Sequence, residues 1–157
     1  MTDDARLAES LDLFEISRLQ ARYGDIVTRR AWDELEALFA PGAPVTIDTR
    51  TGQVIELVGA GAVGAFIAKA IERFAHFEFA MLNAVADLDE GGDTATGRVY
   101  IWEIRADRGT GRWTNAFGLY EDRYTKLEER WVIAQRAYSS LARTAPDLEV
   151  FGFPRGQ

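Results

Sequence analysis

The stretch TATGRVYIWEIR, residues 94–105, alternates two kinds of side chain, and this alternation decides the fold class. One set is small or apolar until its last member: Ala95, Gly97, Val99, Ile101 and Glu103. The other set is polar or aromatic: Thr96, Arg98, Tyr100 and Trp102. Because successive side chains of a strand point to opposite faces, this period of two predicts a strand with one face toward an apolar interior.

Similar patterns on either side of this stretch predict a meander of long strands over residues 77–88, 113–127 and 131–141. Before them, apolar residues recur at helical spacing over residues 3–30, 32–39 and 59–75, with a short hairpin over 45–58. On the first helix we expect one buried stripe: Leu7, Leu11, Phe14, Leu19, Tyr23 and Ile26. Helices followed by antiparallel strands predict an α+β fold. We expect a curved antiparallel sheet wrapped around the N-terminal helices, which leaves a cone-shaped cavity.

The length and composition suit one domain over residues 1–143, followed by an irregular tail over 144–157. The 157 residues include no cysteine and one histidine, His76, which excludes disulfides, thiolate chemistry and any multi-histidine metal site within the chain. We therefore predict no metal and no cofactor. The net charge of −7 argues against a nucleic-acid partner, and no stretch is long and apolar enough for a membrane span. A cytoplasmic location is expected.

Four segments occur in the order and spacing of a known family: YGDIVTRRAWDELEALF (23–39), FEFAMLN (77–83), DTATGRVYIWEIR (93–105) and GLYEDRY (118–124). With residues 131–141, they make the chain resemble the SnoaL-like branch of the nuclear transport factor 2-like superfamily, over about residues 8–143. The resemblance implies the cone fold. It leaves the activity open, because this superfold contains isomerases, dehydratases, cyclases, dehydrochlorinases and binding proteins.

The departures from the family pattern concern its catalytic residues. Relatives that resemble dehydrochlorinase and scytalone dehydratase have an Asp and a His at the positions of Thr28 and Phe79, so that dyad is absent here. Relatives that resemble ketosteroid isomerase have a tyrosine that Tyr23 matches, and their second acid falls near Glu121 or Asp122.

Glu103 is the leading candidate for a catalytic base, because it ends an apolar row that we expect to line the cavity. Burial there raises the pKa of a carboxyl group toward values useful in acid–base catalysis. The alternative is that Glu103 lies near the strand end and pairs with Arg105 or another arginine in solvent. Tyr23 is the candidate donor to a substrate oxygen, or else an aromatic residue of the helix stripe whose hydroxyl is bonded locally.

The candidate substrate-binding residues are the apolar or neutral side chains that we expect at the cavity wall: Thr28, Phe66, Phe79, Met81, Asn115, Phe117 and Leu119. They predict a hydrophobic small-molecule ligand. For each, a purely structural role is the alternative. On the outer face of the sheet we expect four aromatic residues, which favour a homodimer through that face: Trp102, Trp113, Tyr120 and Tyr124.

Three functions remain compatible with these residues. The first is a cofactor-independent enzyme of the dehydratase, isomerase or cyclase type, with Glu103 as base and Tyr23 as hydrogen-bond donor. The second is a non-catalytic binding protein for a small ligand, which the missing Asp and His favour. The third is an assembly module that binds another protein through its sheet.

Overall fold

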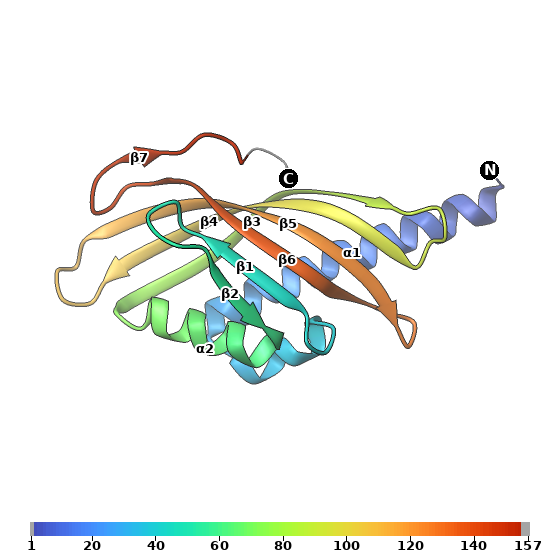
Figure 1. Ribbon diagram of the computed structural model, residues 1–157, viewed down its shortest axis with the longest axis horizontal. Coiled ribbons are helices and arrows are strands. Elements are labelled where there is room, and N and C mark those ends of the chain that lie inside the picture. Colours follow the sequence, from blue (N-terminus) through green and yellow to red (C-terminus); the bar gives the residue numbers. More distant parts are fainter. Residues whose placement is uncertain (1, 155–157) are drawn as a thin grey trace.

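The computed structural model describes residues 2–154 and shows one curved sheet with helices on one side (Figure 1). Its helices are α1 (Asp3–Arg29), the 3₁₀ helix η1 (Trp32–Leu38) and α2 (Gly59–Ile71). Its strands are β1 (Pro44–Asp48), β2 (Ile55–Val58), β3 (Phe74–Leu88), β4 (Thr94–Asp107), β5 (Trp113–Leu127), β6 (Arg130–Arg143) and β7 (Glu149–Val150). The expected order of helices and strands is thus confirmed, and so is the α+β fold class.

The sheet has the order β2-β1-β6-β5-β4-β3, and β7 pairs with β6. All neighbouring strands are antiparallel except β1 and β6, which run parallel. The long strands β3 to β6 curve around α1 and α2, so their inner faces and the helices enclose the core (Figure 1). This arrangement forms the expected cone.

Helix α1 buries only its second half. Thr2 caps its start, where the threonine side chain accepts a hydrogen bond from the backbone N–H of Ala5 at 3.3 Å. The second half packs into the core through five apolar residues: Ile16, Leu19, Tyr23, Ile26 and Val27. The expectation for the first half was wrong, because the three remaining members of the stripe are more than half exposed: Leu7, Leu11 and Phe14.

Except at Trp113, which lies on the outer face as expected, the two faces of β5 are the reverse of the prediction. The ladder pairs Glu103 with Ala116 and Val99 with Tyr120, so the even-numbered residues of β5 share the inner face with the odd-numbered residues of β4. Tyr120 and Tyr124 are therefore buried in the core and do not lie on the outer face. Phe117 lies on the outer face instead, where its ring stacks on that of Trp102.

The tail beyond β6 is less irregular than expected, because it contains β7. Phe151 donates a backbone hydrogen bond to Leu141, and Arg143 forms an ion pair with Glu149. Figure 1 shows this segment on the side of the sheet away from α2. The last part of the predicted tail, residues 155–157, lies outside the described residues. Within residues 2–154, no helix is long and apolar enough to cross a membrane.

Candidate functional site

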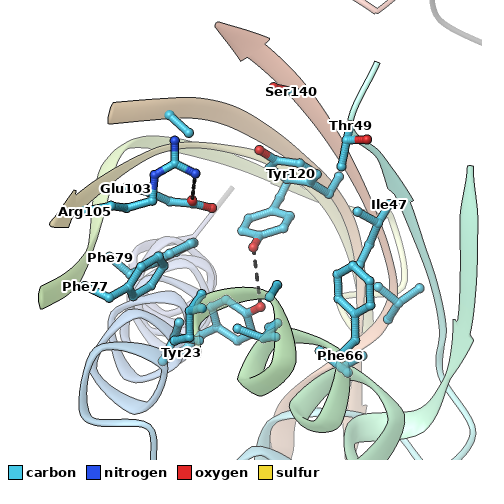
Figure 2. Close-up of a pocket in the computed structure, with 18 of the residues that line it drawn as sticks. Tyr23, Ile47, Thr49, Phe66, Phe77, Phe79, Glu103, Arg105, Tyr120 and Ser140 are labelled. Atoms are coloured by element: carbon cyan, nitrogen blue, oxygen red, sulfur yellow. Dashed lines mark hydrogen bonds and ion pairs between the residues drawn. The ribbon is translucent and has the colours of Figure 1, made fainter. Parts of the chain in front are cut away.

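A cavity of about 220 Å³ lies between the helices and the inner face of the sheet. Most of its wall is apolar and comes from α1, α2, β1 and β3, as Figure 2 shows for Phe66 and Ile47 on one side and Phe77 and Phe79 on the other. Polar groups enter the wall mainly from β4, β5 and β6. Since an apolar cavity of about 150 Å³ holds a benzene molecule, this one has room for a somewhat larger hydrophobic ligand.

Glu103 lies in the cavity wall, as expected, and its carboxylate points into the open space (Figure 2). Its neighbours across the sheet are Phe79 on β3 and Ala116 on β5, and the small alanine leaves the carboxylate uncovered. The side chain is 20% exposed. Burial raises the pKa of Glu103 above its usual value, against the opposing effect of the Arg105 guanidinium.

The alternative interpretation of Glu103, a pair with Arg105, is also partly confirmed. A carboxylate oxygen lies 3.6 Å from an Arg105 nitrogen, and both side chains line the same cavity. Arg105 is itself held by a hydrogen bond to the backbone oxygen of Asn115 at 3.3 Å and lies over the Phe74 ring. Glu103 is therefore paired inside the cavity and not in solvent.

Tyr23 lies in the cavity wall opposite the sheet, and the structure adds a second tyrosine that the sequence analysis had placed outside. The hydroxyls of Tyr23 and Tyr120 are 3.4 Å apart (Figure 2), and their rings meet edge to face at 5.8 Å. Burial raises the pKa of Tyr120 well above its usual value, and the neighbouring Tyr23 adds to this effect. Tyr120 thus stays protonated. Within residues 2–154, no hydrogen bond joins Glu103 to either tyrosine.

A buried ion pair lies against the rings of the two tyrosines. Arg136 of β6 donates from Nε and Nη2 to the two Asp122 oxygens at 2.8 and 2.7 Å, and from Nη2 to Gln20 Oε1 at 2.7 Å. The side chains of Arg136 and Asp122 are 1% and 0% exposed. Of the two residues near which the family resemblance places a second acid, Glu121 and Asp122, only Asp122 is buried, and it is bound to an arginine and does not line the cavity.

The two positions that carry an Asp and a His in relatives do lie side by side. Thr28 Oγ1 accepts a hydrogen bond from the backbone N–H of Phe79 at 3.0 Å. The hydroxyl thus holds β3 against α1, and Thr28 is not part of the cavity wall. The expected position of Thr28 at the cavity wall was wrong, whereas Phe79 lines the cavity as expected.

Four other predicted substrate-binding residues lie outside the cavity wall, whereas Phe66 is part of it. Met81 packs so closely against Gly24 of α1 that a Cβ added to Gly24 would lie 2.9 Å from the Met81 Cγ. Asn115 accepts a hydrogen bond from Trp102 Nε1 at 2.9 Å on the outer face. Phe117 and Leu119 share that face, although Leu119 is fully buried. The positions of Asn115, Phe117 and Leu119 follow from the reversed faces of β5, whereas Met81 lies on β3 and is taken up by its contact with α1.

Sequence reasoning missed the polar residues of the cavity wall on the C-terminal strands. These residues are Tyr120 on β5 and, on β6, Arg136, Tyr138, Ser140 and Arg143. The sequence does carry one signal for them, because Arg136 is a charged residue in the middle of the predicted strand 131–141. Among residues 2–154, no group of three or more His, Asp or Glu side chains is arranged to hold a metal ion.

Comparison with known proteins agrees with this fold. The family model of the SnoaL-like domain matches residues 8–137 of this chain. A proposed scytalone dehydratase from Novosphingobium aromaticivorans has a TM-score of 0.77 at 18% identity, over 99% of this chain and 100% of that chain. A hexachlorocyclohexane dehydrochlorinase from Novosphingobium barchaimii has a TM-score of 0.74 at 15% identity, over 98% and 100%.

A further similar structure is a nuclear transport factor 2-like protein with a cystatin-like fold from Novosphingobium aromaticivorans. It has a TM-score of 0.73 at 22% identity, over 88% of this chain and 87% of that chain. No curated protein matches the chain. At these identities the solved structures show the fold alone, and the match over residues 8–137 shows the family. The chain belongs to the SnoaL-like family.

Proposed function

We propose that this SnoaL-like protein is a cofactor-independent enzyme that performs general acid–base chemistry on a hydrophobic small molecule. The observation that carries the proposal is the polar content of an otherwise apolar cavity. One carboxylate with a raised pKa, Glu103, faces the same space as two tyrosine hydroxyls. A base and a hydrogen-bond donor on different walls of one cavity suit reactions that begin with removal of a proton from carbon.

In the proposed reaction, the ionised Glu103 removes a proton from a carbon next to a substrate carbonyl. The electron pair of the broken C–H bond forms a C=C bond, and the carbonyl electrons move onto the oxygen, to which Tyr23 or Tyr120 donates. An isomerase returns the proton from Glu103 to another carbon. A dehydratase expels a hydroxyl group, which takes up the proton and leaves as water; in a cyclase the enolate carbon attacks a second carbonyl carbon of the same molecule, whose C=O electrons move onto its oxygen, and this oxygen takes up the proton from Glu103.

Arg105 sets how strong a base Glu103 is. Burial raises the pKa of Glu103, and the Arg105 guanidinium opposes this rise because its positive charge favours the ionised carboxylate. At 3.6 Å, Arg105 favours the ionised form without forming a short hydrogen bond that would hold the carboxylate in place. The pair therefore keeps a usable base in an apolar site.

A second function, binding of a small hydrophobic ligand without catalysis, is favoured by one observation. The positions that carry the acid–base dyad in relatives hold Thr28 and Phe79, and the Thr28 hydroxyl is already bonded to the backbone of β3. Neither the Thr28 hydroxyl nor the Phe79 ring can act as a general base. The two functions differ in a single measurable property, namely proton removal from a bound carbonyl compound.

Hydrogen–deuterium exchange of a surrogate tests the enzyme proposal without knowledge of the natural substrate. 2-Indanone, a bicyclic ketone with acidic C–H bonds, is incubated with the protein in D₂O, and its deuterium content is followed by mass spectrometry. We expect the wild type to accelerate exchange and Glu103→Gln to lose about 100-fold or more of that rate.

Glu78→Gln is the matched control, because Glu78 lies on β3 with a half-exposed side chain away from the cavity wall. It should exchange like the wild type. Exchange by Glu103→Gln at the wild-type rate would exclude Glu103 as the base. Binding of 2-indanone without any acceleration by the wild type would favour the binding protein.

A further inference from the structure

Arg143 belongs to a row of side chains that crosses the sheet on its inner face. The strand ladders place five residues next to one another in this row: Phe79, Glu103, Ala116, Arg143 and Glu149. Side chains that are paired directly across strands point to the same face. Ala116 stands between Glu103 and Arg143, so no large side chain fills the space between the carboxylate and the guanidinium, and both residues line the cavity.

Two strand spacings, about 9–10 Å, separate the backbones of Glu103 and Arg143. Tyr138 extends over the strand between them, because a Cβ added to Gly118 of β5 would lie 2.8 Å from the Tyr138 hydroxyl oxygen. Burial raises the pKa of this hydroxyl, the charge of Glu103 adds to the rise, and the guanidinium groups of Arg105 and Arg143 oppose it. All three charged side chains therefore lie close to the Tyr138 hydroxyl.

The charged side chains of the cavity wall attract an anion. Among residues 2–154, three arginines and one carboxylate line the cavity, namely Arg105, Arg136, Arg143 and Glu103. The charge of Arg136 is matched by Asp122 behind the wall, which leaves two guanidinium groups facing Glu103. This local positive excess contrasts with the net charge of −7 of the whole chain. A cleft lined by an excess of one charge concentrates ligands of the opposite charge.

Glu149, the counter-ion of Arg143, comes from β7 and is not part of the cavity wall. One of its carboxylate oxygens accepts from Arg143 Nε and Nη2, whereas Arg143 Nη1 has no acceptor among residues 2–154. The side chains of Arg143 and Glu149 are 20% and 42% exposed, so water and ligands can reach the pair. An ion pair exposed to this degree contributes little stability, and a carboxylate from a ligand can replace Glu149 at small cost.

Fastening the tail is the structural alternative for Arg143, but other contacts hold the tail. Phe151 donates its backbone N–H to the backbone oxygen of Leu141 at 2.8 Å. Arg50 donates from Nη2 to the backbone oxygen of Gly152 at 2.9 Å. The tail thus has attachments that do not depend on the guanidinium of Arg143.

We propose that the ligand of this cavity is a hydrophobic carboxylic acid, and that Arg143 binds its carboxylate. The carboxylate lies against Arg143 on β6 beside the Tyr138 hydroxyl, and the apolar body of the ligand extends toward α1 and α2. The reacting carbon then lies over Ala116, next to Glu103, so the bound carboxylate decides which carbon faces the base. This inference rests on the proposed function for the use of the cavity as the ligand site, and it specifies the substrate class.

Isothermal titration calorimetry at neutral pH with three probes of the same size and different charge tests this subsite. 4-Phenylbutanoate carries a carboxylate, 4-phenylbutanamide is its neutral counterpart, and 4-phenylbutylamine carries a positive charge. We expect the carboxylate to bind at least about fivefold more tightly than the amide, and the amine to bind most weakly. An amide or an amine that binds as tightly as the carboxylate, or no binding of any probe, would overturn the inference.

Variants on the two sides of the ion pair should move the preference for the carboxylate over the amide in opposite directions. Arg143→Met should abolish the preference, and Glu149→Gln should raise it by about threefold, because the competing carboxylate of the chain is gone. Arg130→Met is the matched control, since it removes the same charge from an exposed pair with Glu128 outside the cavity wall and should keep the preference.

A preference that persists in Arg143→Met, or that does not rise in Glu149→Gln, would overturn the assignment to Arg143. If Arg143→Met does not fold, the result for Glu149→Gln decides. Deuterium exchange of 2-indanone, which has no carboxylate, tests Glu103 as the base in a separate assay. Failure of this inference and failure of the proposed function are therefore distinguishable.

Discussion

Replacing Arg136 by methionine removes one partner of a fully buried ion pair and leaves the other charged. Methionine keeps much of the volume, but Asp122 loses two hydrogen bonds and its counter-ion, and its side chain is 0% exposed. Gln20 and Tyr124 still donate to the carboxylate, so part of its solvation remains. Breaking a buried pair in this way costs about 3–5 kcal/mol of folding free energy.

For a domain of this length, 1 kcal/mol corresponds to about 2–4 °C in the melting temperature, so Arg136→Met should lower it by roughly 6–20 °C. The double variant Arg136→Met/Asp122→Asn removes the unpaired charge as well. It should lose less stability than Arg136→Met alone, because an amide in place of the carboxylate can still bond to Gln20 and Tyr124.

Urea unfolding followed by tryptophan fluorescence measures both effects. The matched control is Lys69→Met, which removes the exposed Lys69–Glu72 pair and should leave stability unchanged within error. A loss below about 1 kcal/mol for Arg136→Met would refute the reasoning, since it would mean that Asp122 is not left uncompensated in the folded state. Strict additivity of the two substitutions would refute it too, because contacting residues should couple.

Three further predictions concern other parts of the chain. The raised pKa of Glu103 means that, above the usual glutamate pKa of about 4.3, the folded state binds more protons than the unfolded state, so stability falls as pH rises through this window. In urea unfolding, Glu103→Gln should therefore gain stability relative to the wild type as the pH rises above about 4.3, and a difference that does not change with pH would contradict this. Thr28→Val removes the acceptor of the Phe79 N–H and should cost about 1–2 kcal/mol of folding free energy in the same assay. The affinity for 2-indanone should not change, and a changed affinity would mean that Thr28 does contact the ligand. For the homodimer through the outer sheet face, where Trp113 is 62% exposed, light scattering should give twice the mass of the chain, and a monomer would exclude it.

The pattern of the sequence was sufficient to predict the elements other than β7, the fold class and the inward direction of Glu103. Each of these depends on local periodicity, which one strand or helix carries by itself. The burial of α1 was overestimated, because periodicity gives the direction of Leu7, Leu11 and Phe14 but not whether other elements reach them. In the structure the first half of α1 contacts the sheet through Asp12, which binds Lys126 and Trp131.

The faces of β5 depended on a single residue of register. Pairing the expected strand ends, Arg105 with Trp113, would place odd-numbered residues opposite odd-numbered ones and direct Phe117 and Leu119 inward. The observed ladder pairs Ala106 with Trp113, which reverses every side chain of β5. Apolar content could not correct this error, because the inner positions include small residues such as Ala116 beside the cavity.

The pairing of Asp122 with Arg136 also depends on a shift of one residue in the register of two strands. Counting back from the turn, Leu127 pairs with Arg130, and an unbroken hairpin would place Glu121 opposite Arg136. A bulge between Arg123 and Tyr124 shifts the ladder by one residue and brings Asp122 opposite Arg136 instead. A one-residue bulge has no marked signal in the sequence, so the buried ion pair could not be located from the pattern alone.

The ion pair between Arg143 and Glu149 links the C-terminal segment to the cavity. Arg143 lines the cavity on β6, two strands away from Glu103, and its counter-ion comes from β7. The net charge beside Arg143 therefore depends on Glu149 of β7 as well as on the residues of the cavity wall. A neutral residue at position 149, or a chain that ends before it, would leave a free guanidinium there. Family members could thus change the charge of the ligands they accept through variation in the tail, with every residue of the cavity wall conserved.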